Sequence, residues 1–144
     1  AFDKQGTTAY IVSRKNHVIY KASYDMATGE FNDVKLLAGS FGVTGYADGT
    51  GTSAKFNEPS QGDVDEDGNF YVADRGNHCI RVITPDGEVS TYAGQNKAGM
   101  VDGIASLAEF NNPEGCQFGP DGALYVADYS NHAIRKVEDG PAQP

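Results

Sequence analysis

The strongest constraint on the fold is an internal repeat with a period of 54 residues. The segment FYVADRGNHCIRVI at residues 70–83 returns as LYVADYSNHAIRKV at 124–137, with eight of fourteen positions identical. The match extends without a gap over 45–83 and 99–137, where 17 of 39 positions agree. A fainter copy, YIVSRKNHVIYK, stands at residues 10–21. Each repeat is therefore one structural unit, and neighbouring units must stack to bury a core.

Each repeat is expected to fold as antiparallel strands. The runs YVAD and IRVI are rich in β-branched and aromatic residues and are separated by turn formers. Asp-Gly pairs, which favour tight hairpins, stand between such runs at residues 67–68, 86–87 and 121–122. In the middle repeat the sequence predicts strands near 61–65, 69–74, 79–84 and 88–93. Four strands in a unit of this length are typical of a β-propeller blade.

A short motif ties the repeats to a known family. Asn-His followed by an apolar or small residue occurs at 16–18, 77–79 and 131–133, and Ile-Arg follows the last two copies. With the preceding YVAD and a downstream Ala-Gly, this motif resembles the NHL repeat. The resemblance implies an all-β fold of propeller blades, six to a ring in known relatives. The long Asp-Gly…Ala-x-Phe-Asn-x-Pro connector is similar to that of bacterial cell-envelope proteins that pair an IPT/TIG domain with NHL blades.

We expect one domain holding about two and a half four-stranded blades, at residues 4–39, 56–94 and 110–138. Gly-rich connectors would occupy 40–55 and 95–109, and a tail 139–144. A closed ring needs more blades than this. The chain is therefore expected to belong to a longer protein or to assemble with copies of itself through exposed strand edges.

Three details of these segments are also predicted. Phe56 and Phe110 occupy one repeat position and are expected to fill the seams between blades. The segment 23–33 is longer than its counterpart in the middle repeat, and we interpret it as an enlarged hairpin loop. Residues 54–56 are expected to form one helical turn before the next blade.

Composition excludes some classes of partner. Eleven basic and 20 acidic residues give a net charge of −9, which argues against binding to nucleic acid or to anionic membrane surfaces. No apolar run is long enough for a spanning helix. The two cysteines, Cys79 and Cys116, fall in non-equivalent strands and are interpreted as buried hydrophobic residues.

Polar residues that recur in the repeat are interpreted as structural. All three histidines, His17, His78 and His132, share one repeat position, so a blade width separates them and they cannot converge on one zinc ion. We expect each imidazole to hydrogen-bond a neighbouring turn. Two acid–base pairs and the turn asparagines complete this set: Asp74 with Arg81, Asp128 with Arg135, and Asn16, Asn77 and Asn131.

One acidic stretch admits a metal interpretation. Asp63, Asp65 and Asp67, followed by Gly68, match the start of a calcium loop. The flanking segments are predicted strands rather than helices, so an acidic hairpin without a cofactor is the preferred interpretation, and calcium is the alternative. No phosphate loop, nucleophile elbow or zinc-protease motif occurs in the chain.

The predicted function is recognition. Repetition builds a scaffold and leaves the turns free to vary, and Arg14, Lys15, Arg75 and Tyr129 stand at such turns beside the fixed Asn-His. We expect these residues to engage a protein or glycan ligand, in a periplasmic, cell-surface or extracellular protein. The alternative is a metal-dependent hydrolase or lyase with its site in the central channel, where Gln61, Asp63, Asp65 and Gln117 are available.

Overall fold

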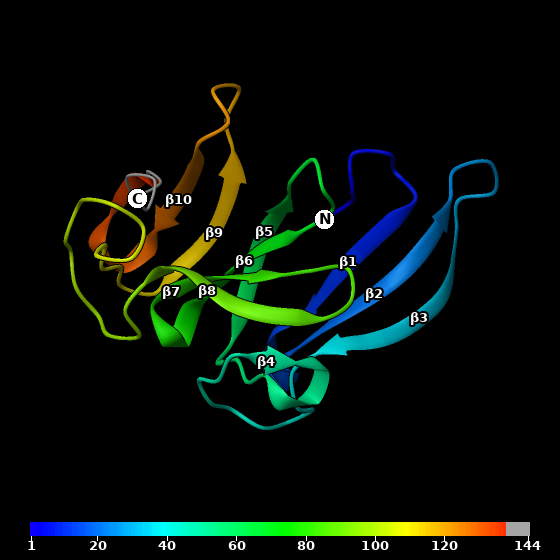
Figure 1. Cartoon of the computed structure of the whole chain (residues 1–144), viewed down its shortest axis with the longest axis horizontal. Coiled ribbons are helices and arrows are strands. Elements are labelled where there is room, and N and C mark those ends of the chain that lie inside the picture. The colour runs from blue at the N-terminus through cyan, green and yellow to red at the C-terminus, as the bar shows by residue number, and fades with distance from the viewer. Residues whose placement is uncertain (138–144) are drawn as a thin grey trace, which may run out of the picture.

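The computed structural model describes residues 1–137, and the tail expected at 139–144 lies outside them. The described residues form three antiparallel sheets, which fan out side by side in Figure 1. The first sheet consists of β1 (Thr8–Ser13), β2 (Val18–Asp25) and β3 (Glu30–Ala38). The second consists of β5 (Pro59–Val64), β6 (Phe70–Asp74), β7 (Cys79–Ile83) and β8 (Glu88–Gly94), with the short strand β4 (Gly49–Thr50) at its edge. The third consists of β9 (Pro113–Phe118), β10 (Leu124–Asp128) and β11 (Ala133–Val137). The all-β prediction is confirmed, and we refer to the sheets as the first, second and third blades.

The same hairpin occurs in every blade. Asp74 pairs with Cys79 and Asp128 pairs with Ala133, so β6–β7 and β10–β11 share one register. A three-residue 3₁₀ turn joins the two strands in each case: η1 (Arg14–Asn16), η3 (Arg75–Asn77) and η4 (Tyr129–Asn131). The histidine that follows each turn adopts the left-handed conformation, with φ between 53° and 59°. Histidine is among the non-glycine residues enriched in this region.

Two apolar clusters lie between the blades. Tyr10 and Ile19 of the first blade share one cluster with Phe56 and Phe70, and the rings of Tyr10 and Phe70 stack with centroids 5.1 Å apart. Phe110 lies in the equivalent cluster between the second and third blades. Phe56 and Phe110 are 0% and 1% exposed, so both connectors deliver a phenylalanine to a seam, as the repeat position predicts.

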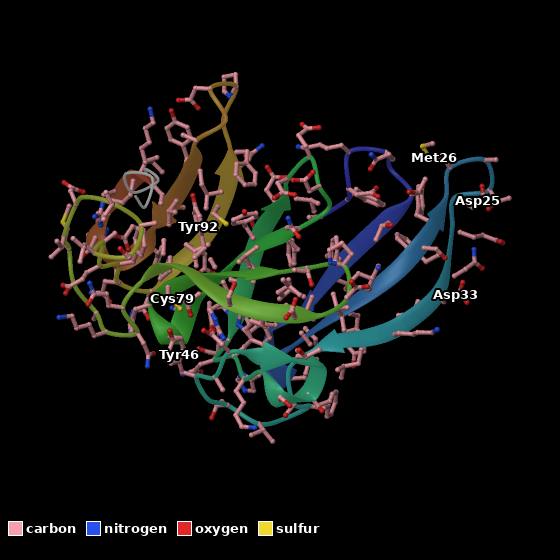
Figure 2. The ribbon with its side chains drawn as sticks, viewed as in Figure 1. Asp25, Met26, Asp33, Tyr46, Cys79 and Tyr92 are labelled. Carbon is pink, nitrogen blue, oxygen red and sulfur yellow. The ribbon has the colours of Figure 1, made fainter. Side chains whose placement is uncertain are left out.

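The first blade departs from the predicted loop. Strands β2 and β3 extend through most of residues 23–33, and only the tip at 26–29 is a turn. Cross-strand aromatic pairing accounts for the extension, because Tyr24 lies opposite Phe31 with ring centroids 4.9 Å apart. Figure 2 shows Met26 at the outer end of this hairpin, beside Asp25.

Two further differences concern the connector and the inner edge. The expected helical turn at 54–56 is wrong; a 3₁₀ turn, η2 (Gly51–Ser53), occupies the three residues directly before it. The short strand β4 pairs with β8. Ala1 exchanges backbone hydrogen bonds with Tyr10 at 3.0 and 2.8 Å. The first residues therefore cover part of the edge of β1 that faces away from β2.

Candidate functional site

A buried polar clasp holds each complete hairpin. Oδ2 of Asp74 accepts hydrogen bonds from Nη1 of Arg81 and Nδ2 of Asn77, both at 2.8 Å. Oδ1 accepts from the backbone N–H of Asn57, also at 2.8 Å. Asp74 and Arg81 are both 0% exposed. Burial opposes the charge of Arg81, but the adjacent Asp74 carboxylate outweighs it and raises the guanidinium pKa.

The third blade repeats the clasp. Oδ2 of Asp128 accepts from Arg135 and Asn131 at 2.7 Å each, and Oδ1 accepts from the N–H of Asn111 at 2.8 Å. The first blade has Ser13 in place of the aspartate, and Asn16 donates to its hydroxyl at 3.0 Å. The recurrent Asp, Asn and Arg side chains thus join a hairpin to its own connector.

Two of the histidines bridge neighbouring blades. Nδ1 of His17 accepts from the backbone N–H of Glu58, and Nδ1 of His78 accepts from that of Asn112, both at 3.0 Å. Burial lowers the pKa of His78, which suits a ring that must stay neutral at Nδ1 to accept this bond. His132 has the same left-handed backbone and is exposed. The turns 14–17, 75–78 and 129–132, with the connector ends beside them, define what we call the turn face.

An ion-pair cluster spans three blades on the turn face. Glu114, on β9, accepts from Nη1 of Arg14 at 2.7 Å through Oε1 and from Nε of Arg75 at 2.8 Å through Oε2. Arg75 also lies 3.4 Å from Oε2 of Glu58. The hydroxyl of Ser60, on β5, donates to the carbonyl of Glu114. The four charged side chains are between 25% and 44% exposed, so solvent or a ligand can reach the cluster.

The structure brings together only part of the predicted ligand-binding set. Arg14 and Arg75 meet through Glu114, whereas Tyr129 stands apart on the third blade with 61% of its surface exposed. Lys15 is exposed beside Arg14. Glu58 and Glu114, which the sequence did not single out, are the acidic partners of these arginines.

Two of the aspartates considered as calcium ligands accept hydrogen bonds from backbone N–H groups. Oδ1 of Asp65 accepts from the N–H groups of Asp67 and Asn69 at 2.9 Å, which closes the β5–β6 hairpin. Oδ2 of Asp63 accepts from the N–H of Phe118 in the next blade at 3.0 Å. Within residues 1–137, no three His, Cys, Asp or Glu side chains gather as a metal site. One carboxylate therefore closes a hairpin turn and the other joins two blades.

Comparison with known families decides what these hairpins are. The NHL repeat model matches residues 56–83 and 110–137, which contain the two complete clasps. The chain belongs to the NHL-repeat family. "NHL repeat-containing protein 2" of Bos taurus is 33% identical over 105 residues, covering 72% of this chain and 14% of the relative. "Protein SUPPRESSOR OF QUENCHING 1, chloroplastic" of Arabidopsis thaliana is 35% identical over 138 residues, covering 90% and 13%. The chain thus spans a small part of the relatives it matches.

Solved structures agree with this assignment. An "auxiliary nutrient binding protein" from Bacteroides thetaiotaomicron superposes with a TM-score of 0.87 at 32% identity, over 95% of this chain and 36% of that one. Its counterpart from Bacteroides ovatus gives 0.87 and 32%, over 97% and 36%. Virginiamycin B lyase from Staphylococcus aureus gives 0.62 at 15% identity, which shows a shared fold alone. The three sheets are NHL propeller blades.

The ion-pair cluster breaks the NHL repeat pattern. Glu114 stands at the repeat position that Ser60 holds one blade earlier, and Glu58 stands where the next blade has Asn112. Arg75 is replaced by Tyr129 in the same way. Sequence reasoning used this variation between NHL copies at the turns, where it found Arg75, but did not apply it to Glu58 and Glu114. Their contact across blades could not be seen without the packing of the blades.

Both cysteines of the NHL blades are buried. Cys79 and Cys116 are free, with exposures of 0% and 8%, and Figure 2 shows Cys79 inside the molecule. Burial raises the pKa of the Cys79 thiol, and raises that of Cys116 to about 12. A thiol in such surroundings does not supply the thiolate that nucleophilic or redox chemistry requires.

Proposed function

We propose that the chain is a recognition module that binds a protein or glycan ligand through the cluster of Arg14, Arg75, Glu58 and Glu114 on the turn face. Membership of the NHL propeller family supports a binding role in general. The finer assignment rests on one observation: two arginines from different blades converge on one carboxylate at an accessible surface. A ligand bound at this cluster would contact several blades at once.

The cluster retains donors for a ligand. A guanidinium carries five N–H donors. Among the described residues, Arg14 donates to Glu114 through Nη1, and Arg75 uses Nε and Nη1 on the two glutamates. Arginine is enriched at binding hot spots because its planar fork matches carboxylates and other polar planes. The remaining N–H groups are therefore suited to carboxylate, hydroxyl or carbonyl oxygens of a ligand.

The cellular context of the proposal is the periplasm, the cell surface or the exterior of a cell. The nutrient-binding proteins of Bacteroides, each 32% identical to this chain, support that setting and a nutrient as one ligand class. No helix within residues 1–137 is long and apolar enough to cross a membrane. Further blades, or a second copy, are the proposed structural partners of the module.

The enzyme alternative has weaker support. The fold is shared with a lyase at 15% identity, a level that carries no assignment of activity. The residues named for a channel-centred site are Gln61, Asp63, Asp65 and Gln117. The carboxylates of Asp63 and Asp65 already accept hydrogen bonds from backbone N–H groups. Recognition therefore remains the preferred proposal.

Affinity measurements with Arg75→Gln test the proposal. The chain would be probed with polygalacturonate, neutral dextran and acidic peptides, and the tightest binder carried forward. Loss of a charge-assisted bond should weaken binding by about tenfold or more. Lys4→Gln, which removes one exposed charge near the N-terminus, should bind as the unchanged protein does. Equal affinities of Arg75→Gln and the unchanged protein, or no binding by any probe, would contradict the proposal.

A further inference from the structure

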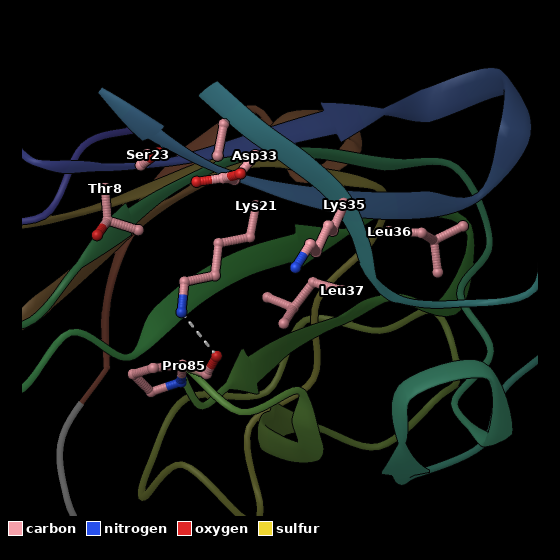
Figure 3. Close-up of a pocket in the computed structure, with 9 residues that line it drawn as sticks. Thr8, Lys21, Ser23, Asp33, Lys35, Leu36, Leu37 and Pro85 are labelled. Carbon is pink, nitrogen blue, oxygen red and sulfur yellow. Dashed lines mark hydrogen bonds between the residues drawn. The ribbon is translucent and has the colours of Figure 1, made fainter. Parts of the chain in front are cut away.

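A cavity lies away from the turn face, along the seam between the first and second blades. It measures about 490 Å³ and is shown in Figure 3. The first blade contributes Lys21 from β2 and Lys35 from β3, and the β7–β8 turn of the second blade contributes Pro85. Thr8 and Asp33 lie at its other end.

The two lysines are directly opposed. Lys21 and Lys35 are register partners in the antiparallel pair β2–β3, so both side chains emerge from one face of the sheet. Like charges directly opposite one another destabilise a strand pair. In the second blade the corresponding partners are Val82 and Ser90, which are uncharged. The scaffold therefore does not require lysine at either position.

The positive charge of this pair is not neutralised by ion pairs. Within residues 1–137, every salt bridge involves other residues. Nζ of Lys21 is held by a hydrogen bond to the carbonyl of Pro85, at 3.0 Å, and Figure 3 shows Lys35 pointing toward the same side of the cavity. Asp33 shares the cavity, and its carboxylate lies toward Thr8 in that view.

We propose that this cavity is an anion site, which binds a carboxylate or phosphate group of a small ligand between the ammonium groups of Lys21 and Lys35. An ammonium binds such oxygens as a compact point charge with three donors. Lys21 spends one donor on Pro85, which fixes its ammonium in place before the anion arrives. A bound anion would relieve the repulsion between the lysines and would link β2 to β3 at the edge of the seam.

Lys35→Met is the informative variant, because Lys21→Met would also remove the bond that joins the blades. The probes are inorganic phosphate and sodium glucuronate, each titrated at constant ionic strength against sodium chloride. The unchanged protein should bind at least one of them, and Lys35→Met should bind it about tenfold more weakly. Lys4→Met, which removes an exposed charge elsewhere, should match the unchanged protein. The two probes distinguish a phosphate ligand from a carboxylate ligand.

Thermal unfolding supplies a readout that a purely structural lysine would not produce. Without either probe, Lys35→Met should melt at the same temperature as the unchanged protein or higher, because repulsion is relieved. With the probe present, the unchanged protein should gain stability by mass action and Lys35→Met should gain less. Equal gains in the two proteins, or an equal loss of binding in Lys4→Met, would overturn the proposal.

Discussion

Nδ1 of His78 accepts a hydrogen bond from the backbone N–H of Asn112 at 3.0 Å, and this bond crosses from the second blade to the third. The same bond joins His17 to Glu58 one seam earlier. An imidazole can accept at Nδ1 only while that nitrogen is unprotonated. The contact between blades is therefore tied to the protonation state of a histidine.

Acidification should weaken the fold through His78. Its pKa is lowered, chiefly by burial, so the unfolded chain binds the proton more readily than the folded one. The stabilising contribution is complete above the unfolded pKa of about 6.5 and is lost as pH falls below it. The free energy of unfolding in urea should fall less between pH 7.5 and pH 5.5 in His78→Asn than in the unchanged protein. Asparagine is chosen because it tolerates the left-handed backbone conformation. An identical pH effect in both proteins would refute this role.

Asp128→Ala should be strongly destabilising, and Asp102→Ala should not. Both carboxylates bind Arg135, but Asp128 is 0% exposed and Asp102 is 90% exposed. Removing the buried partner leaves the buried guanidinium with only the exposed Asp102 as a counterion and leaves the N–H of Asn111 without its acceptor, which costs about 3–5 kcal/mol. The exposed pair contributes about 1 kcal/mol or less. Chemical denaturation of the two variants measures the difference, and similar free energies of unfolding would count against the clasp.

Phe56→Ala should lower the free energy of unfolding by about 3–5 kcal/mol, because a fully buried ring leaves a cavity at the seam. Phe41, in the same connector region, is 63% exposed. Phe41→Ala should stay within about 0.5 kcal/mol of the unchanged protein. Urea denaturation curves compare them. A small effect of Phe56→Ala would show that the seam can close without the ring.

Glu114→Gln should change stability by about 1 kcal/mol or less, because the carboxylate and both arginines are partly exposed and screened by water. The substitution removes the ion pair of Arg14 and leaves Arg75 paired with Glu58 alone, so it should alter ligand affinity more than stability. Thermal unfolding and binding to the turn-face ligand would be measured on one preparation. A large loss of stability with unchanged binding would make Glu114 a structural residue.

Most of the fold could be predicted from the 54-residue repeat. The 54-residue offset places equivalent strands in successive sheets, and the clasp residues recur with it. The extended β2–β3 hairpin was missed because the cross-strand pairing of Tyr24 with Phe31 is not visible in a pattern read along one strand. Strand β4 was missed for a related reason, since only its partner on β8 makes two connector residues a strand.

The candidate site was predicted less completely than the fold. Variable turn residues pointed to Arg14 and Arg75, and the structure places both on Glu114. Glu114 itself lies on a strand, 100 residues from Arg14. Nothing local in the sequence marks such a contact, because it depends on how three blades are stacked. A repeat pattern predicts the residues that its copies share, whereas the residues of this cluster differ between the copies.

Besides the connector side chains Asp48 and Asp102, the clasp arginines bind the backbone of the connectors. Arg81 donates to the carbonyls of Lys55 and Ala47, and the equivalent Arg135 donates to those of Glu109 and Val101. The side chains at these positions change from cationic to anionic and from small to branched, while the bonds persist. Substitution of the side chains whose carbonyls accept these bonds does not remove the bonds. The side chains at these connector positions can therefore change while the path of the connector across the blade is preserved.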